Sequence, residues 1–199
     1  RSRLVVEKLR KRFPNDSILS EEEQDDLKRL DQSRVWLVDP MDGTKELIAR
    51  RGEFAVMIGL AVSGEARLGV VYQPTQDKLY YGVLEEGAYL VSGGVETRLY
   101  VSRETDLSKA TIAMSRSHPS RVTEAIRKRL GIERIIQTGS IGVKIGLICE
   151  GQAHVYIQGR GTKLWDSCAP EAILRAAGGK MTDRLGTALR YDVAEVHNL

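Results

Sequence analysis

Trp36-Leu37-Val38-Asp39-Pro40-Met41-Asp42-Gly43-Thr44 runs from apolar residues into two carboxylates and then into a Gly-Thr pair. Residues 35–38 are expected to form a buried strand. Pro40 is expected to end the hydrogen-bonded ladder, because proline lacks an N–H and has a fixed φ. Asp39 and Asp42 are then expected on a turn, where both side chains can point to one place.

A metal ion would explain two acids in such a turn. Close carboxylates repel each other and raise each other's pKa, and Mg²⁺ relieves this because it binds one or two carboxylates with waters and phosphate oxygens. Gly43 lets a ligand approach the backbone closely, and Thr44 offers a hydroxyl beside an N–H. The same Asp-Pro-x-Asp-Gly pattern also suits an ordinary turn. The segment alone is equally compatible with a plain turn and with a metal and phosphate site.

The composition is that of an ordinary globular protein. The chain has 199 residues, of which 42% are hydrophobic and 29% charged, enough for one large domain or two packed subdomains. Its net charge of +3, without a long basic run with interleaved aromatics, argues against a nucleic-acid polymer as partner. No apolar stretch is long enough to span a membrane, and no signal peptide opens the chain. Cys149 and Cys168 are too few for a disulfide framework and suit core positions in a reducing cytoplasm.

The first half of the chain is expected to be α+β. Leu4, Val5, Leu9 and Phe13 recur at helical spacing and predict a helix over 2–13. A short strand follows, then the acidic run, then an antiparallel meander of strands. The expected strands are 17–20, 35–38, 54–62, 68–72, 79–84, 88–91 and 97–101. Because the chain begins inside this helix and ends without a stop signal, both ends are expected to be trimmed.

The second half is expected to be α/β. Strands and helices alternate there, which is typical of a layered sheet with helices on its faces. The expected strands are 111–115, 132–137, 153–157 and 180–182. The expected helices are 120–130, 141–150 and 164–177. Ser120 and Ser140 are predicted to cap the first two of these helices.

A further acid, Asp166, opens the last long helix beside Trp165. The helix dipole stabilises an acid in the first turn by roughly 0.3–1 kcal/mol, which is one sufficient reason for its presence. A carboxylate against a tryptophan and small apolar residues is nevertheless costly unless it is paired or binds a metal. Four acids follow strand ends or open a helix, and so can reach a common cleft: Glu21, Asp39, Asp42 and Asp166. Together with the Gly-Thr pair they favour a metal-dependent phosphate site.

Three motifs resemble those of a known superfamily. They are Ser20-Glu21-Glu22, Asp39-Pro40-Met41-Asp42-Gly43-Thr44 and Trp165-Asp166-Ser167-Cys168-Ala169-Pro170. Their order and separation are similar to the metal-site motifs of the Mg²⁺-dependent, Li⁺-sensitive phosphatases, which include inositol monophosphatase and fructose-1,6-bisphosphatase. The resemblance implies a layered αβαβα sandwich. Residues 1–106 would form an N-terminal α+β subdomain with the metal site, its first part missing. Residues 107–199 would form a C-terminal α/β subdomain with the specificity elements.

Within that superfamily the chain most resembles the 3′(2′),5′-bisphosphate nucleotidases of the CysQ type. The segments concerned are Trp36 to Glu46, Gly52-Glu53-Phe54, Ser115-Arg116-Ser117-His118, Gly139-Ser140 with Lys144, and Glu150-Gly151-Gln152-Ala153. The implied substrate is 3′-phosphoadenosine 5′-phosphate, cleaved to AMP and phosphate in the sulfur metabolism of the cytoplasm. Its sulphated form, 3′-phosphoadenosine 5′-phosphosulfate, is a second candidate. Dimers are common among relatives, which makes a homodimer one expected assembly.

The resemblance also implies the metal chemistry. Two or three Mg²⁺ ions would be held by Glu21, Asp39, Asp42, Asp166 and the Met41 carbonyl. They would activate a water for in-line attack on phosphorus and stabilise the departing 3′-oxygen. The implied catalytic residues are Glu21, Glu22, Asp42 and Thr44. Glu22 would orient a water from behind the ligands. Simple solvation is the alternative for Glu22 and Glu23, and it is favoured for Glu23.

The implied substrate contacts are Gly43, Thr44, Ser115, His118, Ser140, Lys144 and Asp166. Gly43 and Thr44 would hold the 3′-phosphate, His118 the adenosine moiety and Lys144 the 5′-phosphate. Each of the last two has a plain alternative: His118 as a surface residue, and Lys144 as a side chain that snorkels to the surface. Ser140 caps a helix by default, and a helix N-terminus also suits phosphate.

Two departures from the family pattern are visible. The family's upstream Thr-x-x-Asp element, which helps to activate the attacking water, has no counterpart before Glu21. The arginine that some relatives place after the equivalent of Tyr156 is also missing, with Arg160 or Lys163 as possible replacements. An inositol monophosphatase or sugar-bisphosphate phosphatase, and a non-catalytic nucleotide-binding relative, are the alternative functions.

Overall fold

A seven-stranded sheet is the largest layer of the protein. In the computed structural model, which describes residues 2–198, the strands lie side by side in chain order. They are β1 (Ser17–Ser20), β2 (Arg34–Asp42), β3 (Ala55–Val62), β4 (Glu65–Gln73), β5 (Lys78–Val83), β6 (Gly87–Ser92) and β7 (Val95–Leu99). β1 and β2 are parallel, and each later pair is antiparallel. The predicted antiparallel meander is confirmed.

A second, smaller sheet is built from the second half of the chain. Its strands are β8 (Thr111–Ser115), β9 (Arg134–Thr138) and β10 (Val155–Tyr156), in the order β10-β8-β9 and all parallel. The helices of this half are α3 (Arg121–Arg129), α4 (Ile141–Cys149) and α5 (Leu164–Ala176). Two short strands, β11 (Thr162–Lys163) and β12 (His197–Asn198), pair antiparallel. The predicted α/β pattern is therefore confirmed as well.

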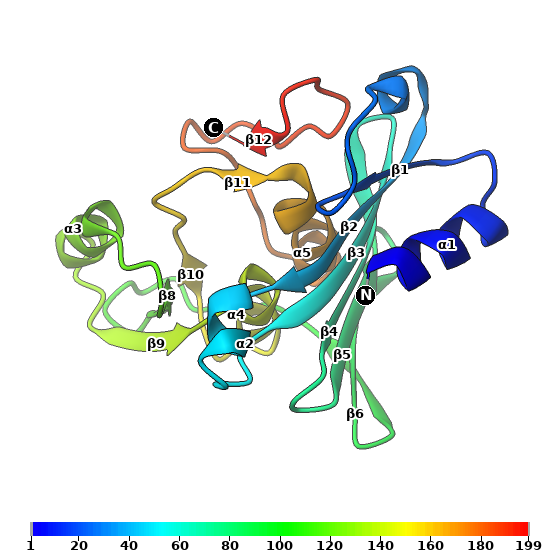
Figure 1. Ribbon diagram of the computed structural model, residues 1–199. Coiled ribbons are helices and arrows are strands. Elements are labelled where there is room, and N and C mark those ends of the chain that lie inside the picture. Colours follow the sequence, from blue (N-terminus) through cyan, green and yellow to red (C-terminus); the bar gives the residue numbers. More distant parts are fainter. Residues whose placement is uncertain (1, 199) are drawn as a thin grey trace.

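Helices and sheets alternate in layers (Figure 1). α1 (Ser2–Arg12) packs on β1 and β2, while α4 and α5 lie between the two sheets. α3 lies beyond the small sheet, at the far end of the molecule from α1 (Figure 1). This order of layers is the expected αβαβα sandwich. The subdomain boundary at residue 106 stays a prediction, and α5 of the second half packs directly on the large sheet of the first.

Three glycines on neighbouring strands bring α5 close to the large sheet. Gly59, Gly69 and Gly82 lie opposite one another in the registers of β3, β4 and β5. A Cβ on Gly69 would lie 2.1 Å from the carbonyl oxygen of Ala169, and one on Gly82 would lie 2.8 Å from the Cα of Ile173. Since no side chain fits between, the helix backbone rests on the bare strands. This contact fixes α5, and with it the acid at its start.

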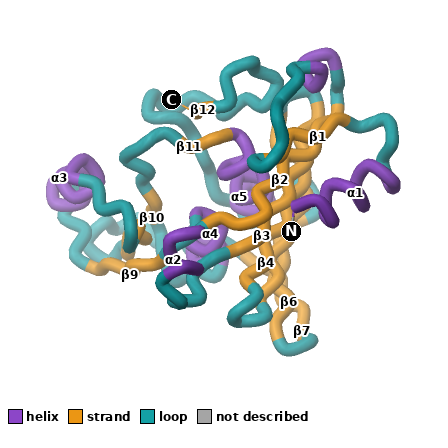
Figure 2. The backbone as a smooth tube through the Cα atoms, in the orientation of Figure 1, coloured by secondary structure: helices purple, strands orange, loops and turns teal. Residues whose placement is uncertain are grey.

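Several short elements differ from those predicted. Residues 180–182 lie in the long loop between α5 and β12 rather than in a strand (Figure 2). The helical turns α2 (Thr44–Ile48) and η1 (Lys28–Asp31), and the pair β11 and β12, had no predicting pattern. Such short elements depend on a partner that is distant in sequence, which local patterning does not reveal.

The cysteines and the helices agree with what the composition suggests. Cys149 and Cys168 are both buried and unbridged, as their predicted core role requires. Over residues 2–198, no helix combines the length and the apolar character needed to cross a bilayer.

Candidate active site

The first two acids meet because β1 and β2 are parallel. Ser20 lies opposite Val38 in this pair, so Glu21 follows β1 at the level where Asp39 follows Val38. The backbone N–H of Glu21 donates to the carbonyl of Val38 (3.1 Å), which continues the ladder by one bond. Glu22 lies next to Glu21 on the exposed loop after β1. The predicted approach of Glu21 to the Asp39 segment is therefore found.

β2 does not end at Pro40, and this expectation was wrong. Asp39 pairs with Met57 and Asp42 pairs with Ala55, so two residues, Pro40 and Met41, oppose one on β3. A bulge leaves a residue out of the ladder, and a proline can occupy it because no N–H is needed there. Asp39 Oδ1 accepts a hydrogen bond from the Met41 N–H (2.8 Å). The two acids thus lie at the end of a bulged strand rather than on a turn beyond it.

Asp42 joins the two halves of the chain. Its Oδ2 accepts hydrogen bonds from the Ser140 hydroxyl (2.6 Å), from the N–H of Gly142 (3.1 Å) and from the N–H of Ile141. Ser140 Oγ in turn accepts from the Val143 N–H (3.1 Å), so the predicted N-cap of α4 is confirmed. A carboxylate at a helix N-terminus is stabilised by the free N–H groups and the helix dipole. The strand end that carries the acids is thereby attached to α4.

The Gly-Thr pair opens the short helix α2. Gly43 has φ +96°, which only glycine adopts readily, and a Cβ there would lie 2.8 Å from the carbonyl oxygen of Glu53. Thr44 is exposed and its hydroxyl donates to the Met41 carbonyl (3.2 Å). A hydroxyl and a close backbone are therefore available directly beside Asp42.

Asp166 is contributed by α5. It lies in the first turn of α5, where its Oδ2 accepts a hydrogen bond from the Lys163 N–H (2.8 Å). The neighbouring Trp165 is buried, and the Lys163 ammonium lies 4.9 Å from the centre of its ring. Asp166 thus caps the start of α5, as the helix dipole suggests. Its carboxylate is also partly buried.

The four acids influence one another electrostatically. Burial raises the pKa of Asp39 to about 9, assisted by the charges of Asp42, Glu21 and Asp166. Burial also raises the pKa of Asp166 to about 7, assisted by Asp42 and Glu21 against the Lys163 N–H. Like charges that share a low-dielectric site disfavour ionisation in this way. Glu21 and Asp42 thus act electrostatically on both Asp39 and Asp166, and the four are called the acid group below.

This group offers the chemistry that Mg²⁺ prefers. Its donors are oxygens only, and Asp39, 2% exposed, is a buried acid without a basic side chain among the groups that shift its pKa. Within residues 2–198, no three His, Cys, Asp or Glu side chains stand close enough to complete a metal site by themselves. Mg²⁺ characteristically takes only one or two carboxylates and keeps several waters. The donor set fits the ion, with waters or phosphate oxygens in the remaining positions.

The expected nucleotide contacts lie on the small-sheet side. Ser115 ends β8, and its hydroxyl accepts from the N–H of His118 (3.3 Å), an exposed residue. Burial and the charge of Lys45 lower the pKa of the His118 imidazole. Histidine here is therefore biased toward the neutral form, which can both donate and accept a hydrogen bond.

Lys144 stays inside the protein, so the snorkelling alternative was wrong. It is 2% exposed, and its ammonium donates to the carbonyls of Ser140 (2.7 Å) and Gly139 (3.2 Å). It also lies 5.0 Å from the ring centre of Tyr156. Burial lowers the pKa of Lys144, while the nearby Asp42, Glu46 and Glu53 charges raise it. The Lys144 ammonium thus binds the backbone at the N-terminal end of α4, the same end that donates hydrogen bonds to Asp42.

An ion pair between Glu53 and Arg116, to which the sequence assigned no role, lies close to the start of α4. Glu53 accepts from Arg116 Nε (2.9 Å) and Nη2 (2.8 Å) and from the Gly139 N–H (2.8 Å). Against burial, these bonds lower the pKa of Glu53. The ion pair joins the segment before β3 to the loops after β8 and β9. Both residues occur in the motifs of the resemblance, but no local pattern identifies them as partners.

Glu46 is a second such residue. It is 3% exposed in α2, and its Oε1 has no hydrogen-bond partner among the described residues. A Cβ on Gly139 would lie 2.3 Å from Glu46 Cγ, which explains why glycine precedes Ser140. The sequence around Glu46 carries no signal for this burial, because α2 itself was not predicted.

The layered sandwich, with its acids beside a Gly-Thr pair, agrees with the class of phosphatases that the three motifs resemble. Comparison with known proteins agrees, since the family model named "Inositol monophosphatase family" matches residues 2–198. The chain belongs to the inositol monophosphatase family. It is therefore a member of a phosphatase family, as the three motifs predicted.

Individual relatives extend this result. The chain is 37% identical to the 3'(2'),5'-bisphosphate nucleotidase CysQ of Salmonella typhimurium strain LT2, over 96% of this chain and 76% of that protein. It is 34% identical to inositol monophosphatase 2 of Rattus norvegicus, over 94% of this chain and 66% of that protein. The crystal structure of CysQ from Bacteroides thetaiotaomicron superposes with a TM-score of 0.83 and 33% identity, over 98% of this chain and 80% of the other.

Proposed function

We propose that this protein is a Mg²⁺-dependent 3′(2′),5′-bisphosphate nucleotidase that converts 3′-phosphoadenosine 5′-phosphate to AMP and phosphate. The observation that carries the proposal is that Asp39 and Asp166, from β2 and α5, both have a pKa raised by burial and by the charges of Glu21 and Asp42, while Asp42 is bound to the start of α4. The similarity to CysQ nucleotidases over nearly the whole chain supports the same substrate. The sulphated analogue, 3′-phosphoadenosine 5′-phosphosulfate, is included as a second substrate.

The acids would hold the metal. Glu21, Asp39, Asp42 and Asp166 supply carboxylate oxygens, and the Met41 carbonyl, which accepts from the Thr44 hydroxyl, supplies a further one. When bound, Mg²⁺ supplies charge that polarises phosphoryl oxygens and lowers the pKa of water. Asp42 keeps a fixed orientation because three donors at the start of α4 hold its Oδ2. Glu22, on the same loop as Glu21, would orient a water toward the phosphorus.

The phosphate and the leaving oxygen would lie beside the Gly-Thr pair. The Thr44 hydroxyl is exposed and can rotate from the Met41 carbonyl to a phosphate oxygen. Gly43 lets the chain turn with φ +96° directly after Asp42, so that its backbone would lie beside the phosphate. Both groups would hold the phosphoryl group in line for attack, and such positioning accounts for much of the catalysis of phosphoryl transfer.

The second phosphate would be recognised by charge from Lys144. Its ammonium is largely desolvated, so an anion nearby would interact with it more strongly than in water. Ser140, at the N-terminus of α4, adds dipole and hydrogen-bonding capacity on the same side. Ser115 and His118 would contact the adenosine moiety. Arg160, exposed in the loop before β11, and Lys163 stay candidates for a further phosphate contact.

The proposal is tested by substrate preference. We expect the full-length protein with Mg²⁺ to release phosphate from 3′-phosphoadenosine 5′-phosphate with kcat/KM at least about 100-fold above that for inositol 1-phosphate, because only the nucleotide offers an anion to Lys144. Faster turnover of inositol 1-phosphate or fructose 1,6-bisphosphate would instead assign the protein to the inositol or sugar branch, to which the 34%-identical rat relative gives some support. Nucleotide binding without turnover would indicate a non-catalytic relative.

Assembly, location and inhibition complete the proposal. A homodimer in the cytoplasm is expected, and the buried, unbridged cysteines are compatible with a reducing compartment. Li⁺ is expected to inhibit by competing at a Mg²⁺ position, as in the family.

A further inference from the structure

A buried arginine lies outside the acid cluster but beside one of its loops. Arg29, in η1, is 3% exposed. A guanidinium is removed from water at such a position only if its charge and its N–H groups find partners. The partners of Arg29 therefore show which segments this buried charge holds together.

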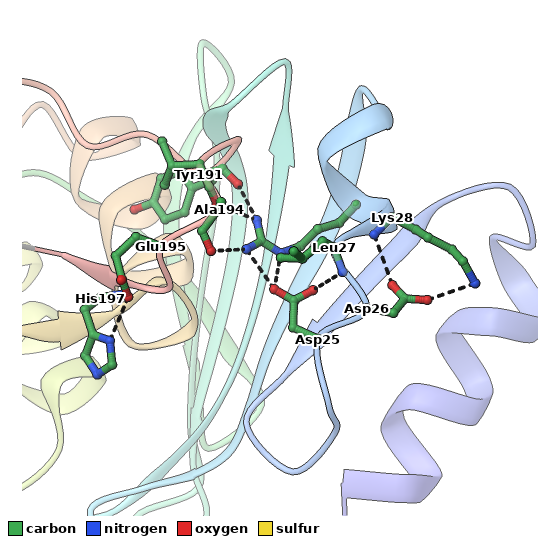
Figure 3. Close-up of polar contacts among 10 residues, drawn as sticks. Asp25, Asp26, Leu27, Lys28, Tyr191, Ala194, Glu195 and His197 are labelled. Carbon is green, nitrogen blue, oxygen red and sulfur yellow. Dashed lines mark hydrogen bonds and ion pairs between the residues drawn. The ribbon is translucent and has the colours of Figure 1, made fainter.

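Arg29 connects a loop to the C-terminal segment. On its own side, Nε and Nη2 bind Asp25 Oδ2, each at 2.9 Å. On the other side, the guanidinium donates to the carbonyls of Val193 (2.9 Å), Ala194 (3.4 Å) and Tyr191 (3.5 Å). Figure 3 shows Asp25 from the loop close to Tyr191 and Ala194 from the C-terminal segment. One side chain thus attaches two regions more than 160 positions apart.

The C-terminal segment continues from Arg29 to Asp166. We call residues 191–198 the C-terminal brace. Its Val196 carbonyl accepts from the Leu164 N–H (2.9 Å), and β12 pairs with β11 immediately before α5. Asn198 Nδ2 donates to Ser167 Oγ (2.8 Å) and to the Lys163 carbonyl (3.2 Å). The brace therefore contacts the residues on both sides of Asp166.

The other end of the connection is the loop that carries Glu21. Residues 21–33 join β1 to β2, and η1 lies within them. Glu21 is attached to β2 by its backbone bond to Val38, while its side chain extends from this exposed loop. Besides that backbone bond, the buried Arg29 side chain attaches the same loop to the C-terminal brace. The loop that carries Glu21 and the first turn of α5, which carries Asp166, are thus linked through Arg29 and the brace.

We infer that Arg29 is a positioning residue for the Mg²⁺ site, setting the separation of Glu21 from Asp166 through the C-terminal brace. The inference rests on the proposed metal-dependent function. Arg29 itself touches neither the acids nor the phosphate. Its replacement should therefore weaken Mg²⁺ binding while leaving the chemistry intact once the metal is saturating, because the metal ligands remain present.

The test compares Arg29→Gln with Arg34→Gln in the full-length protein. Arg34 is a matched control, since it loses the same charge in an ion pair with Asp16 (3.0 Å), and Asp16 keeps its hydrogen bond from Trp36 Nε1 (2.8 Å). Isothermal titration with Mg²⁺ should give an affinity about 10-fold weaker for Arg29→Gln and unchanged for the control. In the nucleotide assay, the Mg²⁺ dependence should shift by the same factor, with kcat at saturating Mg²⁺ within about threefold of the wild type.

A second variant cuts the other end of the connection. Asn198→Ala removes the amide that holds the brace to Lys163 and Ser167, and it should weaken Mg²⁺ binding in the same direction. It decides the matter if Arg29→Gln does not fold. Unchanged Mg²⁺ affinity with a lowered thermal midpoint, or loss of kcat at every Mg²⁺ concentration, would overturn the inference. If wild-type protein binds Mg²⁺ but hydrolyses no nucleotide, the proposed function fails while the titration still tests Arg29.

Discussion

Asp42 illustrates how one residue can serve both the fold and the site. Its Oδ2 accepts three hydrogen bonds at the start of α4, which joins the large sheet to the second half of the chain. The same carboxylate belongs to the acid group whose charges raise the pKa of Asp39 and of Asp166. A substitution that keeps the acceptor oxygen but removes the charge can separate the two roles.

We therefore expect Asp42→Asn to remain folded and to lose activity. An amide oxygen can still accept the backbone N–H groups of α4, so the thermal midpoint should stay within a few degrees of the wild type. A neutral amide is a poor Mg²⁺ ligand, and the rate of nucleotide hydrolysis should fall by at least about 100-fold. Asp77→Asn, in the β4–β5 turn, is the control and should change neither quantity. Full activity of Asp42→Asn would remove the metal hypothesis.

Glu171 allows a prediction about pH. It is 2% exposed in α5, accepts from the Tyr191 hydroxyl (2.6 Å), and burial raises its pKa. A group whose pKa is raised by folding stabilises the protein fully below its unfolded pKa of about 4.3, and this contribution is lost as pH rises through the folded value. When the pH rises from 5 to 8, the free energy of unfolding should therefore fall less for Glu171→Gln than for the wild type. Urea unfolding at both pH values measures this, with exposed Glu7→Gln as the control.

The sequence predicts where the four acids stand along the chain's strands and helices, while their role in a metal site stays a prediction. Glu21 follows a strand, Asp42 ends one and Asp166 opens a helix, and these positions are visible locally, whereas the bulge after Asp39 is not. The orphaned Glu46 and the Glu53–Arg116 pair were missed because their burial and pairing arise only when the two halves pack. For the same reason, the sequence could not decide whether Lys144 binds a phosphate or extends to the surface.

At the scale of elements, the position of Asp166 depends on the contact between α5 and the glycines of β3, β4 and β5. The apolar pattern of 164–177 predicted the helix correctly to within a residue or so. The row of glycines opposite it had no such local signal, since it becomes a row only in the registers of three strands. Conversely, 180–182 has strand-like residues but no ladder partner among the described strands, so it remains a loop.

This contact predicts that Gly69→Ala is strongly destabilising. The new methyl group would lie 2.1 Å from the Ala169 carbonyl, so α5 must move away from the sheet. We expect a loss of about 2–3 kcal/mol in the free energy of unfolding. The control is Gly94→Ala in the β6–β7 turn, where a Cβ meets nothing and only the positive φ of 77° is strained. That variant should lose about 1 kcal/mol.

Urea unfolding of both variants measures the difference. Displacement of α5 should also move Asp166, so folded Gly69→Ala should need more Mg²⁺ for half-maximal nucleotide hydrolysis. Equal destabilisation of the two variants would mean that the helix does not rest on Gly69 as tightly as its geometry indicates.

At the scale of the whole molecule, folding concentrates negative charge that the extended chain keeps apart. Glu21 and Asp39 come from the first half and Asp166 from the second, and they meet only in the layered sandwich. This concentration opposes folding, because burial and the charges of the neighbouring acids raise the cost of ionising Asp39 and Asp166. A cation that binds between them stabilises the native state without binding the unfolded chain, where the acids are dispersed.

We therefore expect Mg²⁺ to raise the thermal midpoint of the full-length protein. At a concentration 100 times its dissociation constant, the gain is about 2.7 kcal/mol, or roughly 5–10 °C for a chain of this size. Asp39→Asn should lose most of this increase, because it removes the most buried acid of the group. In EDTA, the same variant should melt at or above the wild-type midpoint, since asparagine has no charge that folding must neutralise. Differential scanning calorimetry with Mg²⁺, and with K⁺ at equal ionic strength as control, measures both effects. An equal response of wild type and Asp39→Asn to Mg²⁺ would place the stabilising ion elsewhere on the molecule.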